Sequence, residues 1–502
     1  MINRSHAFRI LMLLVCLGAF GGNLLGFDFS TVEGKITDFT LDNGMKFIIM
    51  EDHSAPVVSF VLRANVGGAD DPKQYAGLAH MFEHMAFKGT SEIGAKDFKK
   101  EKKAMEELDA IYAQLRVEEK KGDLADEAIL ADLTEKMKAA QEEAESWVEI
   151  NEFSLAVERN GGVGLNAGTG YDNTSYYFSF PSNKLELWFY LEYSRFNDPV
   201  LRQFYKEKEV IKEERRMRLE SSPMGRLVDE WGHAIYRAHP YGRSLVGEMS
   251  EIHNYDKETA LEFYRTYYVP SNLIAAIVGD IDPAEAEKLA KKYFGKLPKA
   301  PKPPQLIIEE PEQRAERRVS MPDESQPMLL MAFHRPSYTH ADDPVYDAIA
   351  DYLGQGRTSL LYKNLVKDKK IATQAAAFGA YPGGKYPSAF GIFVIPSKDV
   401  TAAECEVEVL VEIERLQNEP IPEDELEKIK ARAKAGLVNS LSSRSGMASQ
   451  LTMMQDVYGD WRALFKTLDK INAVTAEDIQ RVAKDSFTKK NRTVAWIETI
   501  EE

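Results

Sequence analysis

The sequence predicts an α+β protein made of two similar blocks that are joined by a linker. Both blocks contain strand-like runs rich in β-branched residues and stretches with the apolar periodicity of amphipathic helices. Residues 296–311 contain five prolines, which is typical of a linker. The blocks also end alike, because LIAAIVGDI from residue 273 and RTVAWIETI from residue 492 both read as late strands after a helix. This likeness indicates an internal duplication.

Composition and charge narrow the class of protein. The chain has 502 residues, enough for two to four domains, and its 44% hydrophobic and 28% charged residues are ordinary for a globular protein. These values exclude a disordered chain and a small disulfide scaffold. The formal net charge is −16. Since an acidic surface repels phosphate backbones, we expect no nucleic acid partner.

The first 26 residues have the pattern of a secretory signal peptide. Arg4 and Arg9 precede an apolar run of eleven residues at 10–20, which is shorter than the roughly 20 residues needed to span a bilayer. We therefore expect a bacterial exported protein, periplasmic or secreted, with no membrane span after signal cleavage. An uncleaved membrane anchor is the alternative. The mature chain would keep Cys405 alone, so no intrachain disulfide is expected.

Residues 27–297 are expected to form the N-terminal domain. Asn43-Gly44 is a hairpin turn signal between two strands at 39–50. The other expected elements are strands at 57–66, 164–168, 175–180 and 273–278 and helices at 76–87, 184–196 and 201–220. Residues 97–150 are dense in Lys, Glu and Ala, with apolar residues three and four apart on both sides of Gly122. They predict a helical hairpin whose charges form a solvated face.

The linker, residues 298–311, is followed by a second expected domain at 312–502. Strand-like runs occur at 328–333 and 389–395, and amphipathic helices surround them. This block therefore repeats the mixture of elements seen in the first block.

The motif His80-Met-Phe-Glu83-His84 carries the clearest chemistry in the chain. On a helix, residues four apart share a face, so both imidazoles can reach one metal ion. Glu83 stands beside them, where a carboxylate can take a proton from a metal-activated water. The flanking residues are apolar or small, which indicates a buried helix. Buried imidazoles and a buried carboxylate need a compensating partner, and a metal provides one.

A third ligand must come from elsewhere, and the charged helix at 201–220 offers carboxylates. At 100° per residue, Glu207 and Glu214 fall on the apolar side of this helix, whereas Glu209 and Glu213 fall on the opposite face. One of the first two could ligate while the other orients a histidine. The helical wheel does not distinguish them, and a solvated salt-bridge face is the alternative for the whole set.

The run HMFEHMAFKGT at 80–90 resembles the pitrilysin/insulinase family (peptidase M16), whose inverted zinc motif is H-x-x-E-H. The half-sized members, such as the mitochondrial processing peptidase β subunit, are the most similar in pattern. Further matches cover nearly all of residues 35–502: Gly161-Gly162 with Asn166-Ala167, the Glu207 to Glu214 helix, His239-Pro-Tyr-Gly242, the stretch from Tyr267 to Asp280, and GQGRTSLLY from Gly354.

The resemblance implies a site for one zinc ion per chain. His80, His84 and Glu214 would be the ligands, and Glu83 would be the general base. Glu207 would support the site by orienting a ligand from the second shell.

The resemblance also implies a fold and a mode of substrate binding. Two homologous domains, each an antiparallel sheet covered by helices, would form half of a clam shell, and the second domain would be of the inactive peptidase-like type. Asn166 and Ala167 would lie on an edge strand that pairs with the substrate backbone by strand addition.

Two departures from the family pattern matter. Glu214 lies 130 residues after His84, an excess over the family spacing that matches the hairpin at 97–150, so the hairpin reads as an insertion. The family's inactive domain donates an Arg and a Tyr, seven apart, to the substrate, yet Val366 and Thr373 stand at those places. We therefore expect a homologous, zinc-less partner subunit to supply that pair in a heterodimer, with a homodimer as the alternative.

The function expected from these observations is that of an exported zinc-dependent endopeptidase. It would hydrolyse peptides or unfolded segments by a metal-activated water, with Glu83 as the base, and would need a partner subunit for full activity. The alternative is a non-catalytic binding or assembly subunit on the same fold. The intact H-x-x-E-H motif opposes that alternative, and the missing Arg and Tyr favour it.

Overall fold

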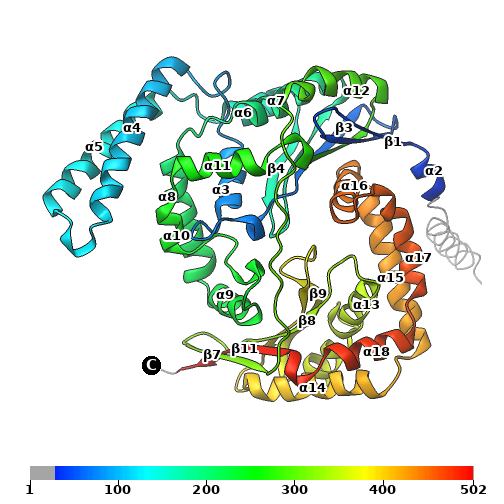
Figure 1. The fold of residues 1–502 in the computed structure, drawn as a ribbon. Helices are drawn as coiled ribbons and strands as arrows, with labels where there is room; N and C mark the ends of the chain where they lie inside the picture. Colours follow the sequence, from blue (N-terminus) through cyan, green and yellow to red (C-terminus); the bar gives the residue numbers. More distant parts are fainter. Residues whose placement is uncertain (1–28, 501–502) are drawn as a thin grey trace, which may run out of the picture.

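The computed structural model describes residues 29–500, which form two halves, each built around one β-sheet (Figure 1). The expected signal peptide lies outside the described residues. Within residues 29–500, every helix is too short or too polar to cross a bilayer.

The sheet of the N-terminal half has six strands in the order β1-β2-β6-β3-β5-β4. Their bounds are β1 (Ile36–Thr40), β2 (Lys46–Glu51), β3 (Val57–Ala64), β4 (Val163–Thr169), β5 (Thr174–Pro181) and β6 (Leu273–Gly279). All neighbours are antiparallel except β2 and β6, which are parallel. The expected turn at Asn43-Gly44 joins β1 to β2, and Gly44 adopts a φ of 97°, a conformation that glycine allows at little cost.

The N-terminal half also contains the helices of residues 29–292. They are α2 (Phe29–Glu33), α3 (Leu78–Met85), α4 (Phe98–Glu119), α5 (Glu127–Ser146), α6 (Glu152–Arg159), α7 (Leu185–Asn197), α8 (Phe204–Arg215), α9 (Pro223–Ile235), α10 (Met249–Asn254), α11 (Lys257–Tyr267) and α12 (Pro283–Lys292). A single π-helical turn, Arg216–Glu220, continues α8. The helices expected at 76–87, 184–196 and 201–220 are thus present as α3, α7 and α8.

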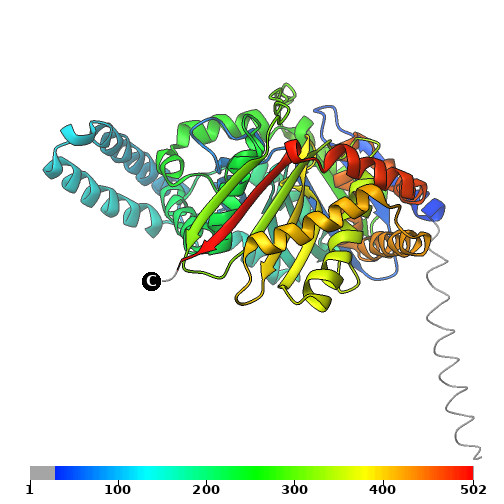
Figure 2. The same ribbon diagram turned by 90° about the horizontal axis from the view of Figure 1, so that it is seen from below.

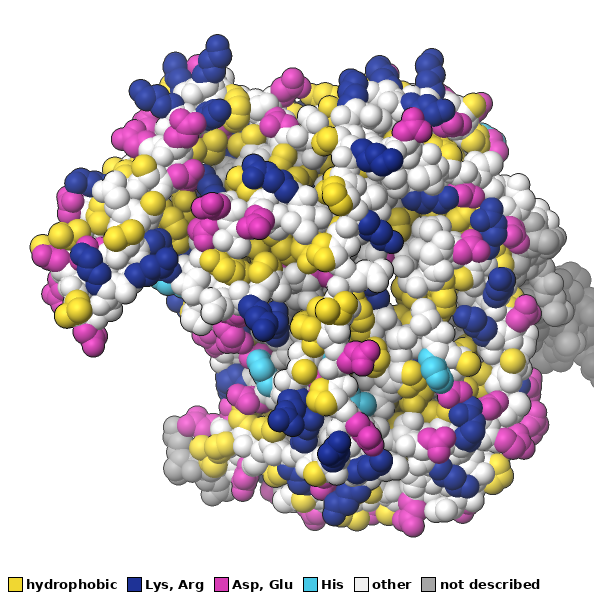
Figure 3. All heavy atoms as spheres, in the orientation of Figure 1, with side chains coloured by type: hydrophobic (Ala, Val, Ile, Leu, Met, Phe, Trp, Pro, Cys, Tyr) yellow, Lys and Arg dark blue, Asp and Glu magenta, His cyan; other side chains and the backbone are white. Residues whose placement is uncertain are grey.

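Helices α4 and α5 form the expected hairpin, which projects from the body of the molecule (Figures 1 and 2). Asp97 and Asp126 cap the two helices by accepting backbone N–H groups of the first turns. Charged side chains of both signs cover the hairpin, with apolar side chains between them (Figure 3). This distribution agrees with a solvated face.

The sheet of the C-terminal half has five strands in the order β7-β11-β8-β10-β9. The elements are β7 (Arg317–Asp323), β8 (Leu329–Arg335), α13 (Asp343–Gly354), β9 (Ala372–Tyr381), β10 (Ser388–Pro396), α14 (Ala402–Asn418), α15 (Glu423–Leu441), α16 (Arg444–Tyr458), α17 (Thr467–Ala473), α18 (Ala476–Ser486) and β11 (Arg492–Thr499). Again one pair, β7 and β11, is parallel and the others are antiparallel.

The two sheets repeat one topology. The order β2-β6-β3-β5-β4 of the first corresponds to β7-β11-β8-β10-β9 of the second, and the parallel pair occupies the same place in both. In each half, the middle strand of these five precedes an equivalent α-helix in the chain: α3 is the first α-helix after β3, and α13 is the first after β8. This correspondence supports the internal duplication that the two late strands indicate.

Each half contributes one helix to the other half's sheet. Leu227, Trp231 and Ile235 of α9 pack against strands β8, β10 and β11 of the C-terminal sheet. In return, Met447 and Leu451 of α16 pack against β2, β3 and β6 of the N-terminal sheet. All five side chains are at most 2% exposed, so the exchange buries a continuous apolar surface. The domain limits at 27–297 and 312–502 remain a prediction.

Candidate metal centre

Helix α3 carries the H-x-x-E-H motif, and its first turn is held by a buried carboxylate. Asp71 accepts the backbone N–H groups of Gly77 and Ala79 at 2.7 and 2.8 Å, which satisfies donors that have no partner within the helix. Gly77 is the N-cap, with a φ of 89°. A Cβ at Gly77 would lie 2.2 Å from the carbonyl oxygen of Val246, so only glycine fits at this position without a shift of the backbone.

Helix α8 turns the expected two of its carboxylates toward α3. The side chains of Glu207 and Glu214 are 10% and 11% exposed, whereas those of Glu209 and Glu213 are 62% and 68% exposed. The division that the helical wheel predicts is therefore present in the structure.

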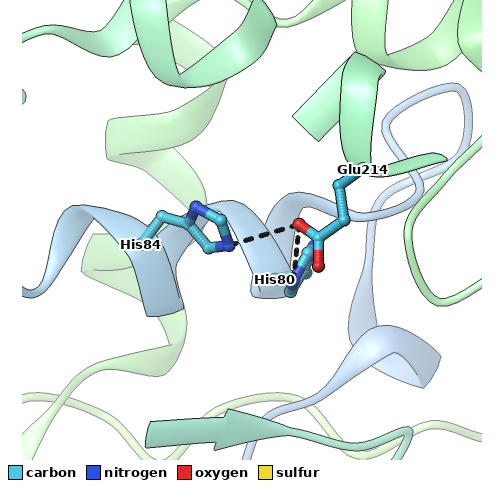
Figure 4. Close-up of side chains that lie close together, drawn as sticks. All are labelled: His80, His84 and Glu214. Atoms are coloured by element: carbon cyan, nitrogen blue, oxygen red, sulfur yellow. Dashed lines mark ion pairs between the residues drawn. The ribbon is translucent and has the colours of Figure 1, made fainter. Parts of the chain in front are cut away.

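Three donor groups converge between α3 and α8 (Figure 4). Glu214 Oε2 lies 3.6 Å from His80 Nε2 and 3.5 Å from His84 Nε2, and the three donor atoms all lie within 4.8 Å of one another. In a tetrahedral zinc site with bonds of about 2.0–2.2 Å, donor atoms lie about 3.3–3.6 Å apart. The spacing and the donor set, two imidazoles and one carboxylate, therefore fit a zinc ion.

A second carboxylate orients His84. The Nδ1 of His84 lies 3.2 Å from Glu207 Oε2, and Lys88 donates to the other oxygen of Glu207. Burial opposes ionisation of Glu207, but its bonds to His84 and Lys88 hold the pKa of this carboxyl below its usual value. Glu207 is thus an ionised acceptor that fixes the ring of His84 and leaves Nε2 facing Glu214.

The two histidines differ in environment. Burial, together with the neighbouring His84 and Arg218, lowers the pKa of His80 to about 3, so its imidazole is neutral and able to bind a metal at neutral pH. Burial also acts on His84, but the hydrogen bond to Glu207 and the charge of Glu214 raise its pKa. Among the described residues, His80 Nδ1 has no hydrogen-bond partner.

Glu214 is positioned by its own neighbour. Its Oε1 pairs with Arg218 at 2.6 Å, so Oε2 is left to face the histidines. Arg218 lies in the π-helical turn that ends α8, a distortion often found beside functional residues.

Glu83 borders a hollow next to these donors. The hollow has a volume of about 260 Å³, and its wall includes Glu83, His84 and Glu207. Phe87 and Ile150 supply apolar surface. The base that the motif predicts therefore faces a space open to a small substrate group.

The expected substrate-binding residues lie on β4, at the edge of the sheet. This strand pairs with β5 on one side only. Asn166 is exposed and Ala167 is buried, and α3 packs next to the strand. An edge strand beside the donors can accept another strand.

Val366 and Thr373 lie in the C-terminal half. Val366 is in a π-helical segment, Tyr362–Asp368, and Thr373 is in β9, the edge strand of the second sheet. Neither residue replaces the guanidinium or phenol that the family pattern has at these places.

Sequence reasoning did not identify two basic residues near the donors, Lys88 and Arg202. Both line the hollow, and Lys88 pairs with Glu207. Lys88 follows His84 by four residues, a spacing that could have placed it on the same helix face. No sequence pattern around Arg202 indicates its role, because its partners are distant in the sequence.

Two family models match the chain. Insulinase (peptidase family M16) matches residues 46–110, which include the H-x-x-E-H motif, and the peptidase M16 inactive domain matches residues 254–433. The chain thus contains two regions similar to peptidase M16 domains, as the sequence pattern indicates.

Individual relatives agree with these matches. The zinc protease PqqE of Helicobacter pylori is 25% identical over 475 residues, which is 92% of this chain and 93% of the relative. A probable mitochondrial-processing peptidase subunit beta of Arabidopsis thaliana is 21% identical over 487 residues, 94% of this chain and 80% of the relative. The crystal structure of a protease from Helicobacter pylori has a TM-score of 0.77 at 25% identity and covers 92% of this chain and 99% of that chain.

Proposed function

We propose that the chain is a zinc-dependent endopeptidase that acts on peptides or unfolded segments. The convergence of His80, His84 and Glu214 at zinc-ligand spacing, beside a hollow that Glu83 borders, supports this proposal. A relative named zinc protease agrees with it. A structural helix pair would have no need for a buried and a half-buried imidazole that both face a carboxylate.

Each residue of the site has a distinct task. A zinc ion held by His80, His84 and Glu214 would polarise the scissile carbonyl and lower the pKa of water. Glu83 takes the proton of the attacking water and passes it to the leaving amine. Glu207 keeps the ring of His84 in place.

Strand β4 is proposed to bind the substrate backbone. Its free edge would pair with an extended peptide, and Asn166 and Ala167 lie at the middle of that edge. A peptide must be extended to add to a sheet. Peptides and unfolded segments therefore suit this edge better than folded proteins.

Full activity is proposed to need a homologous, zinc-less subunit that supplies an Arg and a Tyr. Val366 and Thr373 lack the chemistry to replace that pair, and one relative is named as subunit beta of a processing peptidase. Peptide cleavage by the pure chain should be weak and should rise when such a subunit is added. Full activity of the pure chain as a homodimer would refute the need for that subunit.

The test of the proposed chemistry is Glu83→Gln in the full chain. The variant should keep one zinc per chain, measured by elemental analysis, and should lose cleavage of quenched fluorescent peptides. Glu213→Gln, on the exposed face of α8, is the matched control and should cleave as the unaltered chain does. If Glu83→Gln keeps near-normal turnover, the role of Glu83 is wrong.

A non-catalytic binding or assembly subunit is the second candidate, and the missing Arg and Tyr favour it. For that candidate, the unaltered chain would bind zinc but cleave no peptide, even with the partner subunit present.

The chain is further proposed to be exported to the periplasm or the medium. Arg4, Arg9 and the apolar run at 10–20 support this. Cell fractionation and N-terminal sequencing of the mature protein test it. A cytoplasmic protein with an intact N-terminus would refute export.

A further inference from the structure

We infer that the helical hairpin α4–α5 is a working part of the metal centre, which it reaches through a buried ion pair between Glu101 and Arg202. These are positioning residues, because they act through the segments that carry the metal donors. The inference deepens the proposed function and rests on it.

Arg202 has all five of its N–H donors in use. Its Nε and Nη2 bind both oxygens of Glu101, the second at 2.9 Å. Nη1 donates to the carbonyl oxygens of Lys88 and Ile93, the latter at 3.0 Å, and Nη2 also donates to Thr90 O at 2.9 Å. The side chain is 1% exposed, so these contacts fully define its position.

The guanidinium joins the two helices that carry the metal donors. The carbonyls it binds belong to the loop that continues α3 beyond His84. Arg202 itself stands immediately before Gln203, the N-cap of α8, whose φ of 59° is unusual for a side chain other than glycine. The end of one donor helix and the start of the other are therefore held by a single side chain.

The loop is shaped around this guanidinium. Gly94 adopts a φ of 94°, and a Cβ there would lie 2.6 Å from Arg202 Nη1. At the start of the loop, Lys88 holds Glu207, which in turn orients His84. A shift of the loop would thus be transmitted to a metal ligand by two polar contacts.

Glu101 is the hairpin's contribution. It lies in the first turn of α4 and is fully buried. Without its charge, the guanidinium of Arg202 would be buried and uncompensated, which is strongly unfavourable. Arg202 would then have to leave its site or draw in water, and the loop carbonyls would lose their donor.

The neck of the hairpin provides a second connection. Backbone bonds join Lys96 N to Trp147 O at 2.8 Å and Glu149 N to Gly94 O at 2.9 Å, on either side of an isolated antiparallel bridge between Ala95 and Val148. Residues Val148 and Ile150 of the neck line the hollow that Glu83 borders. The hairpin therefore supplies both a wall of the hollow and the counter-charge of Arg202.

The experiment compares Glu101→Gln with Asp343→Asn in the full chain. Asp343 pairs at 2.5 Å with Arg335, a fully buried arginine that also binds Gly379 O at 2.7 Å and Pro336 O at 3.1 Å. Asp343→Asn therefore also removes the carboxylate charge beside a buried arginine, but in the C-terminal half, away from the metal donors. Zinc affinity is measured by competition with a chromophoric chelator, and stability by urea unfolding of the metal-free protein.

Both variants should be less stable than the unaltered chain. Only Glu101→Gln should also weaken zinc binding, by about 10- to 100-fold, as loss of an orienting contact does. Glu101→Asp, which keeps the charge, should retain part of the zinc affinity that Glu101→Gln loses. Arg202→Lys keeps a charge but lacks the planar guanidinium with its several N–H donors, so it should not retain that affinity. In the variants that still cleave peptides, kcat should fall more than KM changes.

Equal zinc affinity of Glu101→Gln and Asp343→Asn would overturn the inference and leave the proposed function standing. Zinc binding that responds to Glu101→Gln in a chain that cleaves no peptide, even with the partner subunit present, would support the inference and refute the peptidase.

Discussion

Replacing Glu207 by Gln isolates the contribution of a carboxylate that orients a ligand without being one. In the structure, Glu207 binds His84 Nδ1 at 3.2 Å and also accepts from Lys88. Gln keeps the size of the side chain but removes its charge. The amide can still accept one bond from His84, but it no longer compensates Lys88.

The expected loss in zinc affinity is about 10- to 100-fold, or about 1.4–2.7 kcal/mol, the usual effect of removing such a partner. The effect on folding should be smaller, about 1 kcal/mol or less, because Lys88 is 23% exposed and can be hydrated where it stands. Zinc affinity and stability should therefore change by different amounts.

Competition with a chelating dye measures the affinity, and Glu209→Gln is the control. Glu209 lies on the opposite face of α8 and pairs with Lys212 at 2.7 Å, so its loss also breaks one ion pair on the same helix. That control should bind zinc as the unaltered chain does.

A Glu207→Gln variant with unchanged zinc affinity would refute the orienting role. Glu214→Gln should lose far more affinity than Glu207→Gln, because Oε2 of Glu214 faces both imidazoles. If the order of the two variants is reversed, the assignment of ligand and supporting residue is wrong.

Two further predictions concern stability. His239 is 4% exposed, and burial lowers its pKa to about 4. Below about pH 6.5 the unfolded chain binds a proton at this residue, whereas the native state binds it only near pH 4. Up to about 3 kcal/mol of stability should therefore be lost as the pH falls from 6.5 to 4. Urea unfolding of His239→Gln should show a flatter pH dependence in that window, and an unchanged slope would contradict the argument. Leu451→Ala should cost about 2–5 kcal/mol, because this buried side chain of α16 packs on the N-terminal sheet. The loss should appear as one shifted transition for the whole chain, and two separate transitions would show that the halves unfold independently.

The elements that could be predicted from sequence are those with strong local patterns. The turn at Asn43-Gly44, the periodic hairpin at 97–150 and the motif helix with His80 and His84 are all present. The helical wheel separated Glu207 and Glu214 from the exposed glutamates because burial of one helix face is a local property.

Two strands of the second sheet were not identified because their composition is weak for strands. Arg317–Asp323 (β7) is an edge strand with alternating exposed residues and a proline, and Ala372–Tyr381 (β9) is an edge strand rich in alanine. Both gain their stability from pairing with neighbours that are distant in sequence.

Long-range pairing also explains why the sequence did not reveal the ion pair between Glu101 and Arg202. Glu101 and Arg202 are 101 residues apart, and each alone reads as one more charge on a charged helix. The apolar stripe of α9 predicts burial but gives no information on which sheet it covers.

The exchange of α9 and α16 between the sheets determines how the chain could be divided into a split protein. A cut within the proline-rich segment at 298–311 would leave each fragment with one bare sheet face and one unpartnered apolar helix. Each helix is the complement of the other fragment's bare face, with Trp231 on α9 and Leu451 on α16 at the two contacts. The fragments would therefore be insoluble or unstable alone, but would be suited to reassembly when they are produced together.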